Sequence, residues 1–197
     1  MQGNTAIANI LKMEGTEYLF CYPANPLIEA AAIAGIQPIM SRTERTTVNM
    51  ADGYTRVTNG KRTGVVVTQA GPGIENAFAG IAHAYAESTP ILVIPGGTAR
   101  NRLGQSPDFD AVSAYQGVTK WVTQVNQADR IPEMMRRAYT FLRSGRASPV
   151  MVQVPSDVAQ EEISEEAFDY RQVKGYKCAG DPSDIADAVK ALLAVQN

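Results

Sequence analysis

The 197-residue sequence has few of the residues that bind metals or form disulfides. It contains one histidine and two cysteines, and Cys21 and Cys178 lie far apart in dissimilar contexts. A zinc site and a disulfide framework are therefore not expected, and no metal ligand is predicted in this chain. Reduced thiols fit a protein kept in a reducing compartment, so we expect a cytoplasmic location.

Neither sign of charge dominates, and long apolar runs are missing. Eighteen basic and 20 acidic residues give a net charge of −2, which offers no basic surface for nucleic acid. No apolar run approaches the roughly 20 residues that a membrane-spanning helix needs. The first residues, Met1–Asn4, lack the basic and apolar parts of a secretory signal. We therefore expect neither a nucleic acid nor a membrane partner.

Apolar periodicity predicts alternating strands and helices. Helices are predicted over about residues 3–14, 26–33, 43–57, 74–87 and 131–143, and strands near 18–22, 38–40, 64–68, 91–94, 119–122 and 150–154. The strand at 64–68 carries three consecutive valines, and the polar stretch 98–114 is predicted to be a long loop. This pattern indicates an α/β fold: a doubly wound, six-stranded parallel sheet with helices on both faces.

The character of the sequence changes after Pro155. Residues 1–158 are predicted to form the first domain, and the charged stretch 159–180 a linker. Asp181 and Pro182 are typical of a helix start, and the helix that follows aligns four apolar residues: Ile185, Val189, Leu192 and Leu193. We expect residues 181–197 to be the first helix of a truncated middle domain. The alternative is that this helix docks back onto the first domain.

Ligands of open parallel sheets bind beyond the carboxyl ends of the strands. The residues there include neither a GxGxxG nor a GxxxxGK[ST] motif, so ordinary dinucleotide binding is poorly supported. Glu44 follows a predicted strand directly and precedes a helix. It is either a functional carboxylate or an acidic residue that the helix dipole favours at a helix start. The residues alone leave both interpretations open.

Several motifs, in order and at matching spacing, resemble the thiamine diphosphate enzymes of the acetolactate synthase, benzoylformate decarboxylase and pyruvate oxidase superfamily. The matching segments are Tyr22-Pro23, Arg42-Thr43-Glu44, Met50-Ala51-Asp52-Gly53-Tyr54-Thr55-Arg56, Gly71-Pro72-Gly73-Ile74-Glu75-Asn76, Ser88-Thr89-Pro90-Ile91 and Val154-Pro155-Ser156-Asp157-Val158. The resemblance covers about residues 3–158 and implies an N-terminal pyrimidine-binding domain.

The resemblance implies roles for particular residues. Glu44 would hydrogen-bond a ring nitrogen of the cofactor's aminopyrimidine and favour the imino tautomer, whose exocyclic nitrogen removes the thiazolium proton. Pro72 and Asn76 would border the pyrimidine, while Pro23 and the backbone of Ala24 would line the opposite wall. Gln116 resembles a family glutamine on the substrate side.

The resemblance also implies what this chain lacks. Family members hold the diphosphate through Mg²⁺ in a separate domain marked by Gly-Asp-Gly, which does not occur here. Their active site lies between this domain and the diphosphate-binding domain of another subunit. The resemblance therefore implies a homodimer or higher homo-oligomer, and a fragment that is inactive alone. FAD as a further cofactor stays open.

The expected function is the N-terminal domain of an acetolactate synthase-like enzyme that decarboxylates a 2-oxo acid with thiamine diphosphate and releases, ligates or oxidises the product. Thr43, Arg45 and the pair Ala24-Asn25 depart from the family pattern and leave the substrate open. Two alternatives remain: a separate pyrimidine-domain subunit of a two-chain decarboxylase, and a non-catalytic α/β binding module. The exposed helix after residue 181 argues against the separate subunit.

Overall fold

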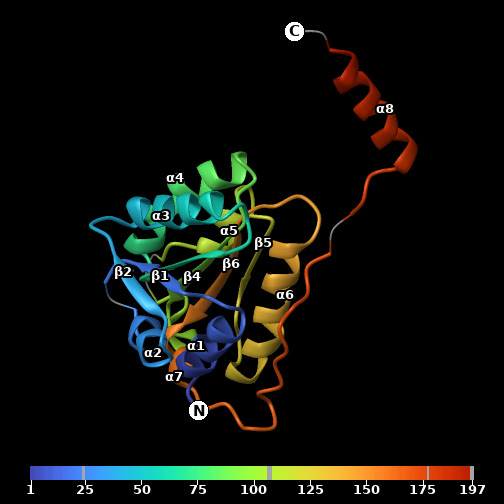
Figure 1. Cartoon of the computed structure of the whole chain (residues 1–197). Coiled ribbons are helices and arrows are strands. Elements are labelled where there is room, and N and C mark those ends of the chain that lie inside the picture. The colour runs from blue at the N-terminus through green and yellow to red at the C-terminus, as the bar shows by residue number, and fades with distance from the viewer. Residues whose placement is uncertain (24, 106–107, 177, 196–197) are drawn as a thin grey trace.

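The structure is a computed structural model that describes residues 1–23, 25–105, 108–176 and 178–195. In these ranges six parallel strands form one sheet in the order β2-β1-β3-β4-β6-β5 (Figure 1). The strands are β1 (Tyr18–Cys21), β2 (Gln37–Met40), β3 (Gly64–Thr68), β4 (Ile91–Gly97), β5 (Trp121–Gln124) and β6 (Val150–Pro155). The six-stranded parallel α/β fold expected from the sequence is confirmed.

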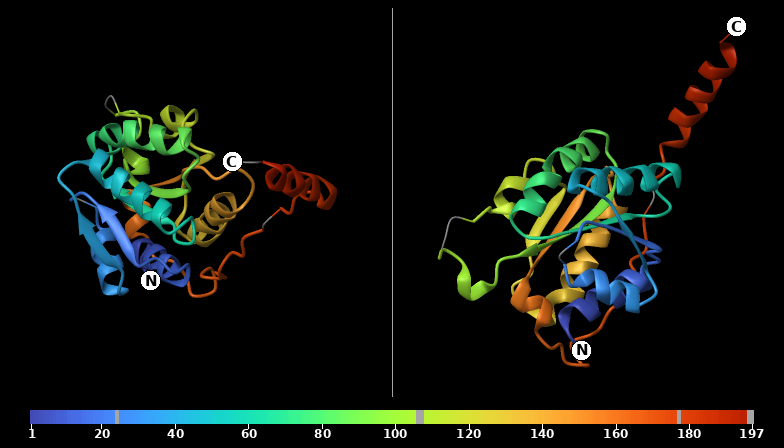
Figure 2. Two further views of the ribbon diagram at one scale, coloured as in Figure 1. Left: turned by 45° about the horizontal axis from the view of Figure 1, so that its top comes forward. Right: turned by 90° about the vertical axis from the view of Figure 1, so that its left-hand side faces the viewer.

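Helices cover both faces of the sheet (Figures 1 and 2). One face packs against α1 (Gly3–Met13), α2 (Leu27–Ile33), α6 (Ile131–Arg143) and α7 (Ser156–Gln160). The other packs against α3 (Glu44–Val57), α4 (Pro72–Ala86) and α5 (Ala111–Tyr115). Two short 3₁₀ helices, η1 (Arg100–Arg102) and η2 (Ala128–Arg130), lie in connections. The sheet is therefore the middle of three layers.

The central strands are hydrophobic throughout because both of their faces are buried. In β3, Val65, Val66 and Val67 have no exposed surface. Val65 and Val67 pack into the core on the α1 side, whereas Val66 packs into the core on the α3 side. Strand β2 contains Pro38 and lies at the edge of the sheet, where a residue without an amide proton is tolerated.

The order of the strands reverses between β1 and β3. From β1 the chain runs outward to β2, then returns across β1 to β3 and continues to the other side. Such a reversal opens a crevice at the carboxyl ends of the strands, where the connections diverge. The fold thus predicts a ligand site among the residues that follow β1, β2 and β3.

The segment predicted as a loop over 98–114 contains a helix that the sequence pattern did not reveal. Asp110 caps α5 by accepting a hydrogen bond from the Ser113 amide, at 3.0 Å. The buried Tyr115 hydroxyl donates to the carbonyl of Ile74 in α4, at 2.6 Å. Because this anchor comes from a residue far away in the sequence, local periodicity could not show it. Strand β5 then begins at Trp121 rather than Thr119.

The C-terminal part of the chain first packs on the domain and then leaves it. Ile163 and Tyr170, which lie in the predicted linker, are only 2% and 6% exposed. Helix α8 (Pro182–Ala194) stands apart from the sheet and its helices, with all its residues exposed (Figures 1 and 2). The division into two domains remains a prediction. None of the helices in the described ranges is long and apolar enough to cross a membrane.

Candidate functional site

The predicted site residues gather at the carboxyl end of the sheet. Pro23 follows β1, Glu44 begins the helix after β2, and Pro72 begins the helix after β3. Glu44 is buried, at 6% exposure, while Pro23, Pro72 and Asn76 are exposed. The site is therefore a set of surface groups around one buried carboxylate.

Local hydrogen bonds fix the start of α3. The Thr43 hydroxyl caps the helix by accepting from the Thr46 amide at 3.2 Å. The carbonyl of Thr43 accepts from the Ser41 hydroxyl at 2.7 Å and from the Thr47 hydroxyl at 3.1 Å. These bonds hold the turn before Glu44 in one conformation, so the backbone that carries the carboxylate is rigid.

The Glu44 carboxylate has no protein partner in the ranges that the structure describes: it forms no hydrogen bond and no ion pair there. The positive end of the α3 dipole offers some stabilisation to its charge. Its oxygens are not among the fully enclosed, unpartnered side-chain atoms of the described ranges, so the carboxylate is accessible at the surface of the site. The arrangement fits a ligand whose ring nitrogen shares a proton with this carboxyl group, as the aminopyrimidine expected from the sequence would.

Asn76 lies on the turn of α4 that faces the turn of Glu44. The two helices run parallel and in register: His83 on α4 faces Asp52 on α3, with 4.0 Å between Nδ1 and Oδ2. Gly80 packs against Val48, and a Cβ added to Gly80 would lie 2.8 Å from Val48 Cβ. Because Asn76 and Glu44 each precede this contact by one turn, the close packing at Gly80 brings their turns together.

The start of α4 depends on a glycine. Gly71 has φ of 58° and ψ of −116°, a conformation that side chains disfavour, and Pro72 follows as the first helical residue. Beneath this turn the Thr68 hydroxyl is buried, with no hydrogen-bond partner in the described part of the chain. Sequence reasoning missed Thr68, because nothing in a strand of valines distinguishes its hydroxyl from a structural one.

The loop after β1 is held by Asn25, which sequence reasoning noted only as a departure from glycine. Its side-chain amide donates to the carbonyl of Thr68 at 2.9 Å and accepts from the Leu27 amide at 3.0 Å. Ala24, whose backbone was expected to line the site, lies outside the described residues. Asn25 therefore ties the exposed Pro23 loop to the end of β3.

Gln116 follows Tyr115, whose hydroxyl donates to the carbonyl of Ile74 near the start of α4 at 2.6 Å. The side chain of Gln116 is exposed, and no hydrogen bond in the described ranges links it to the other predicted residues. A role on the substrate side stays a prediction.

Cys21, at the carboxyl end of β1, has the properties of a core residue. Its side chain is fully buried, and its thiol lies 3.2 Å from the sulfur of Met40. Burial raises the pKa of the Cys21 thiol to about 11, so the thiol is protonated near neutral pH. A neutral, enclosed thiol is not a nucleophile.

The structure gathers no metal site in the ranges it describes: no three His, Cys, Asp or Glu side chains there could together hold an ion. A large hollow of about 630 Å³ lies elsewhere, at the amino end of the sheet, and none of the predicted site residues lines it. The candidate site is thus defined by its chemistry and its place in the fold.

Comparison with known proteins gives a consistent result. Residues 1–129 match the family described as "Thiamine pyrophosphate enzyme, N-terminal TPP binding domain". A probable acetolactate synthase large subunit from Methanocaldococcus jannaschii is 32% identical over 98% of this chain, and the acetolactate synthase large subunit of Haemophilus influenzae is 31% identical over 100% of it. A glyoxylate carboligase from Escherichia coli O157:H7 is 33% identical over 100%. The chain spans about a third of the length of these relatives, 34%, 36% and 34% respectively.

Proposed function

The chain belongs to the thiamine pyrophosphate enzyme family, as its N-terminal TPP binding domain, and from that premise we propose that it activates the cofactor in an acetolactate synthase-like enzyme. The whole enzyme would decarboxylate a 2-oxo acid and release the product or join it to a second carbonyl compound. The similarity to acetolactate synthases and to a glyoxylate carboligase supports this reaction class.

The observation that carries the proposal is Glu44, a residue that is only 6% exposed at the start of α3 but whose carboxylate oxygens are not enclosed and have no partner in the described ranges. Thiamine diphosphate, when bound, supplies the carbanion chemistry of the reaction. Glu44 then shares a proton between its carboxyl oxygen and a ring nitrogen of the aminopyrimidine. The hydrogen bonds of Thr43 at the start of α3, which hold the backbone before Glu44, support this role.

Neighbouring residues shape the space around this carboxylate. Pro72 and Asn76, at the start of α4, border the ring on one side. Pro23 and the backbone of Ala24 would form the other wall, and Asn25 donates to the carbonyl of Thr68 at the end of β3. Gln116 would lie on the substrate side.

The proposal also includes partners. The diphosphate-binding domain of another subunit, with Mg²⁺, completes the site in a homodimer or larger homo-oligomer, so this chain alone is inactive. FAD is left open as an additional cofactor. A cytoplasmic location keeps the two free thiols, Cys21 and Cys178, reduced.

The test is substitution of Glu44 in the full-length gene product, assayed with thiamine diphosphate, Mg²⁺ and 2-oxo acids. Glu44→Gln removes the exchangeable proton and should lower kcat by about 10²- to 10⁴-fold. Glu75→Gln is the matched control, since Glu75 is an exposed acid in the first turn of α4. The control should retain its activity. Full activity of Glu44→Gln would refute the assigned role.

The same assay separates the alternatives. A subunit of a two-chain decarboxylase would be active only after mixing with a second polypeptide, and Glu44→Gln would abolish that activity. A non-catalytic module would bind no thiamine diphosphate, whether alone or mixed with a second polypeptide. Calorimetric titration of the full-length protein with thiamine diphosphate and Mg²⁺ distinguishes this case from an enzyme whose substrate has not been found.

A further inference from the structure

The polar segment between β4 and α5, which the sequence predicts to be a long loop, projects from the body of the domain (Figure 2). The structure describes it over residues 98–105 and 108–110. Long connections of this kind in a compact domain usually serve a function. The role proposed for Glu44 does not use the segment, so its own role has to be sought in its contacts.

Both ends of the segment lie against the chain at the start of α4. Before its first residue, Gly96 of β4 is so close to the loop before α4 that an added Cβ would lie 3.3 Å from the Ala70 nitrogen and 3.8 Å from Asn25 Nδ2. After its last residue, the Tyr115 hydroxyl of α5 donates to the carbonyl of Ile74 in α4 at 2.6 Å. The segment therefore begins and ends beside the part of α4 that is expected to border the cofactor ring.

Arg100, in η1, fastens the segment to two other connections at the carboxyl end of the sheet. Its Nε lies 2.6 Å from Asp157 Oδ2, and its backbone amide donates to Asp157 Oδ1 at 3.1 Å. Its Nη2 lies 3.0 Å from Glu161 Oε2, and its Nη1 donates to the carbonyl of Asn126 at 2.7 Å. Asp157 and Glu161 follow β6, and Asn126 follows β5. These contacts, the Arg100 clasp, therefore join the connections after three neighbouring strands, β4, β6 and β5.

The Arg100 clasp is suited to fixing a conformation and not to stabilising the whole domain. The side chains of Arg100 and Asp157 are 36% and 31% exposed, and ion pairs at such positions contribute little to the free energy of unfolding. Both oxygens of one carboxylate accept from Arg100, which fixes the orientation of the two residues. Burial opposes the charge of Asp157, but the hydrogen bonds from Arg100 outweigh it and hold the pKa of Asp157 below its ordinary value. The clasp is therefore charged and closed near neutral pH.

We propose that Arg100 is a positioning residue, which holds the segment after β4 as a wall of the substrate side and thereby sets the affinity for the 2-oxo acid. This inference rests on the function proposed for Glu44. Arg100 acts through the segment, because its own donors are taken by the clasp. Between the segment and the start of α7 lies a hollow of about 290 Å³, lined by Thr98, Ala99, Arg102, Gln105, Asp108 and Ser156. The clasp fixes both sides of this hollow, whose volume is near the lower end of the range of small-molecule sites.

Limited trypsin digestion of the 197-residue chain tests the clasp. Arg102 is exposed two positions after Arg100, so the rate of cleavage after Arg102 reports how often the segment opens. Arg100→Gln and Asp157→Asn should each speed this cleavage about fivefold, and the double variant should add little to either change. Arg137→Gln is the control, because it removes an exposed arginine of α6 from an ion pair with Glu133. The control should leave cleavage after Arg102 unchanged.

Steady-state kinetics of the full-length gene product test the substrate wall. Arg100→Gln should raise the KM for the 2-oxo acid about threefold or more, with kcat and the affinity for thiamine diphosphate nearly unchanged. Arg100→Lys keeps the charge but loses the planar group that reaches several acceptors at once, so its KM should lie between those of the wild type and Arg100→Gln. It also carries the comparison if Arg100→Gln does not fold. Glu44→Gln lowers kcat instead, so the two roles are measured separately.

Three results would overturn the role of Arg100. The first is equal cleavage after Arg102 in Arg100→Gln and Arg137→Gln, and the second is an unchanged KM although the segment opens faster. The third is a fall in kcat without a change in KM. A wild-type protein without thiamine diphosphate-dependent activity would refute the proposed function and with it the substrate role of the segment. The cleavage rates would then still decide whether Arg100 holds the segment.

Discussion

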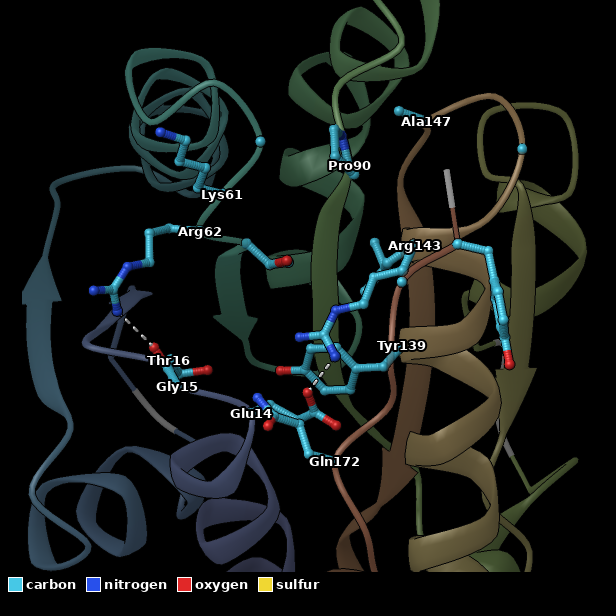
Figure 3. A pocket seen from close by; sticks show the side chains of 16 residues that line it. Glu14, Gly15, Thr16, Lys61, Arg62, Pro90, Tyr139, Arg143, Ala147 and Gln172 are labelled. Carbon is cyan, nitrogen blue, oxygen red and sulfur yellow. Dashed lines mark hydrogen bonds and ion pairs between the residues drawn. The ribbon is translucent and has the colours of Figure 1, made fainter. Parts of the chain in front are cut away.

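The two ends of the sheet each carry a buried glutamate, Glu44 at the carboxyl end and Glu14 at the amino end, in different surroundings. At the carboxyl end, Glu44 is buried without a partner in the described ranges, and the groups around it lie on open surface. At the amino end, Glu14 is also buried, but Arg143 pairs with it and Tyr170 donates a hydrogen bond to it, and a hollow of about 630 Å³ lies beside it (Figure 3). Hollows of about 630 Å³ occur at both ends, the one at the carboxyl end lined by Pro23, so the comparison teaches that cavity volume alone is not the guide to the proposed catalytic residue. An unsatisfied carboxylate on a rigid turn carries more information.

The largest expected effect concerns access to the carboxyl end. Cys21 ends β1 there and is buried, whereas Cys178 is exposed in the segment before α8. With its pKa raised to about 11, Cys21 should be only ~0.1% thiolate at pH 8. Iodoacetamide should therefore alkylate Cys178 at least about 100-fold faster, as measured by peptide mass spectrometry.

The alkylation rate at Cys21 should rise with pH. A raised thiol pKa means that the reactive thiolate is scarce below it, so the rate at Cys21 should increase about tenfold per unit between pH 8 and 10. Cys178→Ser simplifies the measurement to one thiol. Equal rates at the two cysteines would mean that the end of β1 is open to solvent.

The next effect is on stability and tests the amino end. Arg143→Met leaves the buried Glu14 without its cation and should cost about 3 kcal/mol of unfolding free energy, the low end for a buried pair because Arg143 is 23% exposed. Glu44→Gln, at the other end, removes a charge that has no protein partner in the described ranges, so the free energy of unfolding should stay the same or rise. Urea unfolding of both variants measures the difference.

A double variant controls the Arg143 prediction. Combining Arg143→Met with Glu14→Gln removes the uncompensated charge but keeps a side chain that can accept from Tyr170 and the Val173 amide. It should recover part of the loss. If Arg143→Met and Glu44→Gln cost the same, the two buried acids are not in different situations and the comparison fails.

The smallest effect concerns the packing that brings Asn76 to Glu44. Gly80→Ala places a methyl group 2.8 Å from Val48 Cβ, so α3 and α4 must separate, at a cost of about 1–3 kcal/mol. Gly53→Ala, on α3, meets nothing within 4 Å and should instead stabilise by about 0.5–1 kcal/mol. Thermal unfolding of the two variants is the measurement, and a stabilising Gly80→Ala would contradict the close contact.

Much of the fold could be predicted because local patterns coincide with tertiary structure in the central strands. The valines of β3 are buried on both faces of the sheet, so their continuous hydrophobic run directly indicates a central strand. Helices α5 and α7 were missed because they depend on distant anchors, such as the Tyr115 bond to Ile74. The same holds for the predicted linker, whose Tyr170 is buried against Glu14, more than 150 positions earlier in the chain.

The functional residues also differ in whether the sequence could indicate them. Glu44 could be proposed from its place after a strand and from the resemblance, and its burial at the start of α3 is consistent with that proposal. The Arg100 clasp could not be anticipated, since Arg100, Asn126 and Asp157 share no motif and meet only through the fold. Sequence patterns show residues that act through a common segment. They do not show residues that only the topology brings together.

The side chain of Asn25 has a consequence for the geometry between the first and third strands. The backbone ladder joining β1 and β3 ends with the pair Cys21 and Val67. Beyond it, one amide group continues the connection, donating to Thr68 and accepting from Leu27. A displacement of the loop after β1 is therefore transmitted to the end of β3 through the two hydrogen bonds of the Asn25 side chain. An ionised aspartate at this position could still accept from the Leu27 amide but could not donate to Thr68, so the connection to β3 would be lost.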